Sequence, residues 1–206
     1  TMGDLLSDLN IPERQEEAVA VKAPVFPFIK LRGLDPAPGP EMKSTGEVMG
    51  SHKNAAAAYL KARMATEIPV PTHGGVYITV KDSDKESIIP LAKSLKDMEF
   101  DLYATRGTAA ILRERGGLEV NSAYRIAEQG SPDALDLMRD GKIQLIINTP
   151  TNSGGAVLDG NMMRRLAVEL NIPFVTTLSG ATMEVQAVAE MIKGLPEPRS
   201  LTIGTV

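Results

Sequence analysis

The chain has 206 residues, of which 43% are hydrophobic and 23% charged, and its formal net charge is −4. This length fits one ordinary domain with about 60 to 80 residues to spare. The composition is typical of soluble folded proteins and argues against a disordered, collagen-like or membrane-spanning chain. With no cysteine in the sequence, disulfides, thiolate metal sites and cysteine nucleophiles are excluded. The acidic balance and the lack of a basic run disfavour nucleic acid and anionic membranes as partners.

The two histidines, His52 and His73, leave little room for a Ser/His/Asp triad or a multi-histidine metal site. Neither lies on an apolar periodic face, so both are expected at the surface. Any chemistry must then rely on carboxylates, lysine, arginine and hydroxyl groups. The sequence opens without a basic and apolar leader, which argues against a signal peptide. Since Met2 follows Thr1, we expect the chain to be a piece of something longer.

The first seventy residues are rich in proline, which permits only short strands and turns. Val25–Leu31 is expected to form an edge strand, because proline is confined to sheet edges. Leu34–Pro40 is expected to be a loop. Alanine, leucine and lysine predict a helix within His52–Ala65, followed by a linker at Pro69–Pro71.

From Gly74 onward, strand-like and helix-like segments alternate, which predicts five βα units and a doubly wound, mainly parallel five-stranded sheet. The expected strands are Val76–Val80, Phe100–Ala104, Leu118–Ile126, Ile143–Asn148 and Pro173–Thr176. The expected helices run from Ser83 to Met98, Thr108 to Arg115, Ser131 to Asp140, Gly160 to Leu170 and Ala181 to Ile192. Local signals include a capping box of Ser83 with Glu86, and Pro132 in a first helical turn.

Polar residues follow four of these strands. In an open parallel sheet the ligand binds beyond the carboxyl ends of the strands, so these residues are expected to meet at one edge. They are Thr79, Lys81 and Lys85 after the first strand, Thr105–Thr108 after the second, Asn148 and Thr149 after the fourth, and Thr176, Thr177, Ser179 and Gly180 after the fifth. This set of hydroxyls, an amide and cations predicts a pocket for a small anion.

The segment Thr105–Thr108 is the most informative of these. Gly107 allows a close approach of the backbone, and a helix beginning near Thr108 presents free amides, so the segment suits a phosphate. Taken alone, it fits an N-capping threonine at an ordinary turn better. Lys85 taken alone likewise fits a solvated helix lysine. The convergence at four strand ends shifts the balance towards a ligand site.

Features nearer the C-terminus are more ambiguous. Gly154 and Gly155, in the expected loop from Thr151 to Gly160, fit either a mobile lid or a flexible connection. Asp159 either contacts a ligand or, as its position before Gly160 favours, caps the next helix. Met162 and Met163 are more often core residues than ligand contacts, although methionine also lines adaptable pockets.

The run Gly39–Gly50 reads Gly-Pro-Glu-Met-Lys-Ser-Thr-Gly-Glu-Val-Met-Gly and precedes an Ala/Lys-rich helix, a linker and five βα units. This order resembles the C-terminal part of the large chain of the carbamoyl-phosphate synthases. The resemblance implies that residues 1–70 are the tail of an ATP-grasp domain with its linker. It implies that residues 74–206 are a methylglyoxal-synthase-like regulatory domain. The parent enzymes make carbamoyl phosphate from bicarbonate, glutamine and ATP for arginine and pyrimidine biosynthesis, whereas this fragment would have no catalytic residues.

The resemblance also implies a nucleotide monophosphate effector, UMP or IMP. The phosphate-binding positions carried over are Lys85, Thr105, Gly107, Thr108, Arg125 and Asn148, with Arg125 in place of the more usual lysine. The nucleoside-binding positions are Thr79, Asp159, Met162 and Met163. The segment Thr151–Leu158 departs from the family in length and composition, which bears on the choice of effector.

The same resemblance implies no metal and no cofactor in this part of the chain, and ATP with Mg or Mn in the parent enzyme. Implied partners are the rest of the large chain and the glutaminase small subunit, in the cytoplasm. A different class remains as the alternative: a methylglyoxal-synthase-like lyase acting on a triose phosphate. That reaction needs a positioned carboxylate and usually a histidine, and the strand-end carboxylates here are Asp82, Asp84 and Asp159.

Overall fold

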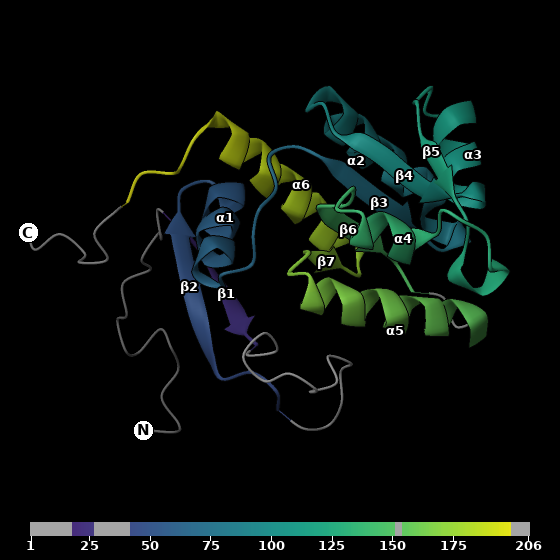
Figure 1. Cartoon of the computed structure of the whole chain (residues 1–206). Helices are drawn as coiled ribbons and strands as arrows, with labels where there is room; N and C mark the ends of the chain where they lie inside the picture. The colour runs from purple at the N-terminus through teal and green to yellow at the C-terminus, as the bar shows by residue number, and fades with distance from the viewer. Residues whose placement is uncertain (1–17, 27–41, 151–153, 199–206) are drawn as a thin grey trace, which may run out of the picture.

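The computed structural model describes residues 18–26, 42–150 and 154–198. A first part, here called the N-terminal unit, consists of the antiparallel strands β1 (Val19–Val25) and β2 (Gly46–His52) and the helix α1 (Ala55–Ala65). A second part is a five-stranded sheet with helices on both faces. Helix α6 (Leu178–Lys193) lies between α1 and the larger sheet (Figure 1).

The larger sheet has the order β5-β4-β3-β6-β7, and all its neighbouring strands are parallel. Its strands are β3 (Gly75–Thr79), β4 (Asp101–Thr105), β5 (Asn121–Ala123), β6 (Leu145–Asn148) and β7 (Phe174–Val175). The chain winds from β3 outward to β5, then crosses to β6 and winds the other way. The strand order therefore reverses between β3 and β6, and the predicted doubly wound α/β fold is confirmed.

The pleat of the central strands sends successive side chains into two separate cores. Ile78 and Ile147 pack with helices α2 (Lys85–Asp97), α3 (Arg106–Glu114) and α6. Tyr77 and Ile146 pack on the opposite face with α4 (Ala134–Arg139) and α5 (Gly154–Glu169). Both faces of the sheet are covered, which is why β6 is buried along its whole length.

In the N-terminal unit, α1 packs against β2 through small residues. The Asn54 side chain caps the helix and accepts hydrogen bonds from the amides of Ala56 and Ala57 at 2.8 and 3.4 Å. Ala58 and Ala62 are fully buried. A Cβ at Gly50 would lie 2.1 Å from the carbonyl oxygen of Ala58, so only glycine fits there. The predicted helix in His52–Ala65 is confirmed, and this glycine sets how closely it approaches the strand.

A buried ion pair joins the N-terminal unit to α6. Arg63 donates from Nε and Nη2 to the two carboxylate oxygens of Glu184, both at 3.1 Å. The hydroxyl of Tyr59 donates to the same carboxylate at 2.7 Å. Glu184 is only 1% exposed. The burial of Tyr59, and then the negative charge of Glu184, raise the pKa of Tyr59. Because the carboxylate is fully satisfied only with α1 in place, the two parts are held in a fixed contact.

Some predicted element boundaries were wrong. Of the edge strand expected at Val25–Leu31 only Val25 belongs to β1, and positions from Pro27 lie outside the described residues, as does the loop at Leu34–Pro40. The capping box of Ser83 with Glu86 is absent in the described structure. A 3₁₀ turn, η2 (Asp82–Asp84), precedes α2, and Glu86 pairs instead with Arg115, the residue that follows α3.

Helix starts also differ from the prediction, most clearly in α4 and α5. Helix α4 begins at Ala134 rather than at Pro132, because Asp133 and Asp136 cap it reciprocally with hydrogen bonds of 2.9 and 3.1 Å. Helix α5 begins at Gly154, so both glycines of the expected lid or connection belong to its first turn. Asp159 therefore lies inside this helix, and its favoured role as a cap was wrong.

Candidate ligand-binding site

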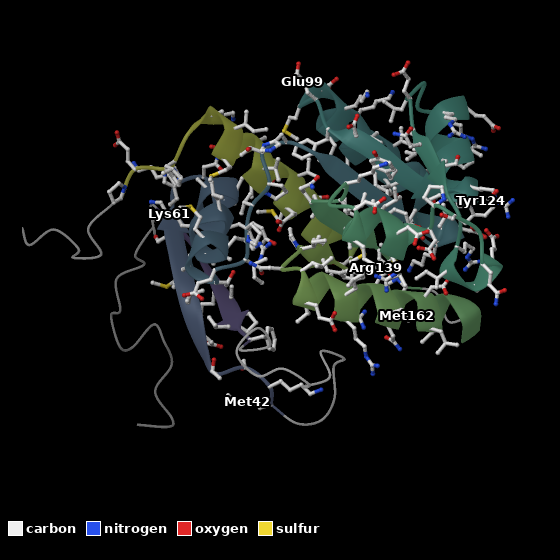
Figure 2. The ribbon with its side chains drawn as sticks, viewed as in Figure 1. Met42, Lys61, Glu99, Tyr124, Arg139 and Met162 are labelled. Carbon is white, nitrogen blue, oxygen red and sulfur yellow. The ribbon has the colours of Figure 1, made fainter. Side chains whose placement is uncertain are left out.

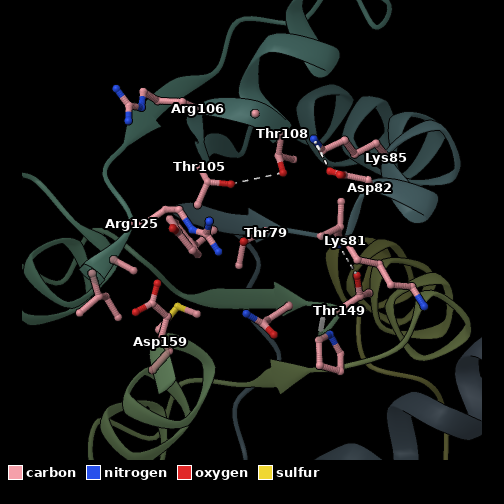
Figure 3. Close-up of a pocket in the computed structure, with 18 of the residues that line it drawn as sticks. Thr79, Lys81, Asp82, Lys85, Thr105, Arg106, Thr108, Arg125, Thr149 and Asp159 are labelled. Atoms are coloured by element: carbon pink, nitrogen blue, oxygen red, sulfur yellow. Dashed lines mark hydrogen bonds and ion pairs between the residues drawn. The ribbon is translucent and has the colours of Figure 1, made fainter. Parts of the chain in front are cut away.

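A cavity of about 540 Å³ opens at the carboxyl ends of β3, β4 and β6, at the point where the strand order reverses (Figure 3). Most of the predicted site residues come together here, but Met162 and the polar group expected after the fifth strand, Thr176, Thr177, Ser179 and Gly180, do not line the cavity. The lining includes Thr79, Lys85, Thr105, Gly107, Thr108, Arg125, Asn148, Asp159 and Met163. Met162 does not line the cavity and is 47% exposed on α5 (Figure 2). Asp159 and Met163 are one helical turn apart and share a face, whereas Met162 lies on the flank turned to solvent.

The floor of the cavity is formed where the two central strands end. Thr79 of β3 and Asn148 of β6 are partners in the sheet register. The amide of Thr149 donates to the carbonyl of Thr79 at 3.1 Å, and its hydroxyl accepts from the amide of Lys81 at 3.0 Å. Asn148 lines the cavity and is 8% exposed. These bonds fix the strand ends beneath any bound group.

One wall is the N-terminal turn of α3. The helix begins at Arg106, two residues earlier than expected, with Thr105 at the N-cap position. The Thr105 side chain makes no capping bond; its hydroxyl donates instead to the Thr108 hydroxyl at 3.4 Å. The free amides of a helix N-terminus and its positive dipole end favour an anion. Because the Thr105 side chain makes no capping bond, the geometry does not support the alternative of an ordinary N-capping threonine.

Lys85 supplies a cation close to this turn. Its ammonium group lies 2.7 Å from Asp82 Oδ1, and its side chain is 22% exposed. A Cβ at Gly107 would come within 3.2 Å of Lys85 Nζ, so glycine leaves room for the ammonium group beside the helix turn. The hydrogen bond from Lys85, and then its charge, lower the pKa of Asp82. Lys85 is thus held at the cavity rather than free in solvent.

A second cation and a buried carboxylate face each other on the opposite wall. In Figure 3 Arg125 points towards Thr79, with the carboxylate of Asp159 beside it. Asp159 is 8% exposed. Its burial raises the pKa of the carboxyl group, while the charge of Arg125 and a hydrogen bond from the amide of Ala127 act the other way. Burial also raises the pKa of Tyr77, which lines the cavity below.

Tyr77 and Glu128 line the cavity but did not stand out in the sequence. Tyr77 sits in a run of apolar strand residues, and the pleat alone marks it as facing α4 and α5. Glu128 lies in η3 (Ile126–Glu128), a short turn without a periodic signal. Arg106, on the rim, points away from the cavity in Figure 3 and pairs with Glu128 at 2.8 Å. Its guanidinium also lies 5.6 Å from the ring centre of Tyr124.

Comparison with known proteins identifies relatives over nearly the whole chain. A "Carbamoyl phosphate synthase large chain, C-terminal section" from Methanopyrus kandleri is 46% identical over 90% of this chain. A "Carbamoyl phosphate synthase large chain" from Methanothermobacter thermautotrophicus is 44% identical over 97% of it. The chain is homologous to the C-terminal part of the carbamoyl phosphate synthase large chain. It spans 34% and 19% of the length of these two relatives. The resemblance expected from the sequence is confirmed.

A family model described as an MGS-like domain matches residues 87–176. This match and the strand order together confirm the predicted methylglyoxal-synthase-like fold. Among solved structures, methylglyoxal synthase from Elizabethkingia anophelis is 18% identical, with a TM-score of 0.48, covering 56% of this chain and 79% of its own.

Residues 18–26, 42–150 and 154–198 contain no helix long and apolar enough to cross a membrane. Within the same ranges, no group of three or more His, Cys, Asp or Glu side chains is placed to hold a metal ion.

Proposed function

We propose that this chain is the effector-binding part of the large subunit of a glutamine-hydrolysing carbamoyl-phosphate synthase, and that its cavity binds a nucleoside monophosphate such as UMP or IMP. The observation that supports this best is the convergence of a helix N-terminus, hydroxyl groups and cationic side chains, among them Lys85 and Arg125, in one cavity. That cavity lies at the switch point of the sheet, where open α/β folds bind their ligands. The homology described above supports the identity of the parent enzyme.

The phosphate is proposed to sit against the first turn of α3. The amides of Gly107 and Thr108 and the hydroxyl of Thr105 are donors there, and Lys85 adds a charge-assisted contact. Arg125 approaches from the opposite wall and offers a planar fork that suits phosphate. Because two cations face a helix N-terminus, the site favours a doubly charged anion over a neutral ligand.

The nucleoside is proposed to extend from there towards α5. Asp159 and Met163 line that side, and Thr79 and Asn148 form the floor between the two halves. A buried carboxylate can accept hydrogen bonds from a ribose or a base, and methionine offers an adaptable apolar surface. Met162, outside the lining, would contact only a ligand that extends over the rim.

The remaining parts of the proposal concern the whole protein. The parent would make carbamoyl phosphate from bicarbonate, glutamine and ATP, in the cytoplasm, for arginine and pyrimidine biosynthesis. ATP with Mg or Mn would bind in the rest of the large chain, and a glutaminase small subunit would be its partner. In this proposal the chain described here regulates that reaction and carries no step of it.

A lyase acting on a triose phosphate is the alternative use of the same cavity. The described lining provides the carboxylates Asp82, Glu128 and Asp159 but no histidine. Asp82 is engaged by Lys85 and Glu128 by Arg106. Asp159, with its raised pKa, is the one suited to move a proton.

Calorimetric titration of the purified chain with UMP, IMP and inorganic phosphate tests the proposal. We expect one nucleotide to bind at one site per chain, more tightly than inorganic phosphate, because the nucleoside adds contacts along α5. In parallel, incubation with dihydroxyacetone phosphate should release no phosphate. Phosphate release at about 1 per second or faster, without nucleotide binding, would replace this proposal with the lyase.

A further inference from the structure

Glu128 is an unexpected residue in an anion site, since a carboxylate on the wall repels a phosphate. It lines the cavity with its side chain 32% exposed. The hydrogen bond from Arg106, and then one from the backbone of Arg125, lower the pKa of Glu128, so it is ionised at neutral pH. The role of Glu128 must therefore lie in the contacts that its carboxylate makes with the protein.

The two oxygens of this carboxylate bind two different walls of the cavity. Oε1 accepts from Nη2 of Arg106, the first residue of α3, at 2.8 Å. Oε2 accepts from the backbone amide of Arg125 at 3.1 Å. The side chain therefore links the helix turn proposed to hold the phosphate with the residue that supplies the opposing cation.

The segment that carries Arg125, here called the rim segment (Tyr124–Gly130), also contacts two other elements: the amide of Ala127 donates to Asp159 of α5, and the Tyr124 ring lies 5.6 Å from the guanidinium of Arg106. The amide of Glu128 donates to the carbonyl of Arg125 at 2.9 Å, closing η3. Tyr124 is anchored by its amide to the carbonyl of Pro132 at 3.0 Å, and its ring lies against Gly130, where a Cβ would come within 2.3 Å. The sheet pairing of Ala123 with Thr105 and the Tyr124 ring hold the start of the segment near α3, whereas Glu128 links the backbone of Arg125 itself to Arg106.

We propose that Glu128 is a positioning residue that holds Arg125 against the phosphate site by bridging its backbone amide to Arg106. This inference rests on the proposed function, because it needs a phosphate to bind in the cavity. For the change in ligand affinity on removal of Glu128, it predicts the opposite sign to that expected from charge repulsion alone. If Glu128 only adds negative charge, removing it tightens binding; if it positions Arg125, removing it weakens binding.

The test is calorimetric titration of UMP against Glu128→Ala, Glu128→Gln and the matched control Glu190→Ala. Glu190 pairs with Lys193 on α6 at 2.8 Å and does not line the cavity. We expect Glu128→Ala to weaken UMP binding about three- to tenfold. Glu128→Gln, which keeps an acceptor oxygen but not the charge, should lie between it and the wild type, and Glu190→Ala should match the wild type.

A double-mutant cycle with Arg125→Ala separates positioning from a general effect on the fold. In the Arg125→Ala background, Glu128→Ala should no longer weaken binding, because the side chain it positions is gone. Equal or tighter binding by both Glu128 variants, or full additivity with Arg125→Ala, would overturn the inference while leaving the proposed function intact. Failure of the wild type to bind UMP, IMP or inorganic phosphate would overturn both.

Discussion

The N-terminal unit and the five-stranded sheet are built on different principles. The sheet buries branched and aromatic side chains in two cores, one on each face. The N-terminal unit buries mainly the alanines of α1 and leaves large apolar side chains exposed, among them Val19, Met49 and Met64 at 41%, 52% and 43%. Alanine contributes little apolar area, so this unit gains less from burial than the sheet does.

The contrast shows where each part obtains its stability. The sheet has sufficient apolar area within itself, and its carboxyl edge is left free for polar residues. The N-terminal unit depends on two local devices: the close approach of α1 at Gly50 and the buried contact of Arg63 and Tyr59 with Glu184. Disrupting either feature should therefore destabilise the N-terminal unit more than the ligand site.

The largest effect is expected for Arg63→Ala. The change leaves the carboxylate of Glu184, 1% exposed, without its cation. Breaking one side of a buried ion pair typically costs about 3–5 kcal/mol. The free energy of unfolding from urea titration should fall by that amount, whereas Lys193→Ala, in an exposed pair, should change it by at most about 1 kcal/mol. Equal small losses in both variants would mean that the contact with α6 contributes little.

Gly50→Ala is expected to act on the N-terminal unit alone. The added methyl group would meet backbone atoms of Ala58 and Ala62 at 2.1 and 2.5 Å, so α1 must move away from β2. Such overpacking costs about 1–3 kcal/mol. Amide exchange should accelerate in β1, β2 and α1 while β3 and β6 stay protected.

Gly46→Ala is the matched control for this change. Gly46 lies on the same strand, and beyond its two chain neighbours no atom of the described residues lies within 4 Å of a Cβ added there. It should leave amide exchange at the wild-type rate. Faster exchange throughout β3 and β6 in Gly50→Ala would show that the two parts unfold as one and would remove the distinction drawn above.

A smaller effect of opposite sign is expected at the ligand site. Because burial raises the pKa of Asp159, the folded state disfavours its ionised form. Its contribution to stability is therefore present at low pH and is lost as pH rises through the folded pKa. Asp159→Asn should be more stable than the wild type at about pH 8 and differ less at about pH 4. Lower stability of the variant at the higher pH would show that the carboxylate is favourably bound when charged.

Much of the sheet could be predicted from the sequence because strand and helix periods differ clearly from Gly74 onward. The strand-end part of the site could be predicted because Thr79, Thr105 and Asn148 are the last residues of β3, β4 and β6, and parallel strands end at one edge. Boundaries set by local hydrogen bonding could not, since Ser83 and Glu86 have the spacing of a capping box but find other partners. Glu128 was missed because one of its two partners, Arg106, is 22 residues away in the sequence and only the fold brings it near.

The central claim, that the cavity binds a nucleotide phosphate against α3, is tested most directly by titrating Lys85→Ala with the nucleotide that the wild type binds. The variant removes one charge-assisted contact, worth about 1.5–3 kcal/mol, so affinity should fall roughly tenfold to a hundredfold. Thr108→Ala should also weaken binding. Lys93→Ala, an exposed lysine on the same helix outside the cavity lining, is the control and should bind as the wild type does. If Lys85→Ala and Thr108→Ala both bind as tightly as Lys93→Ala, the phosphate lies elsewhere and the site is wrongly assigned.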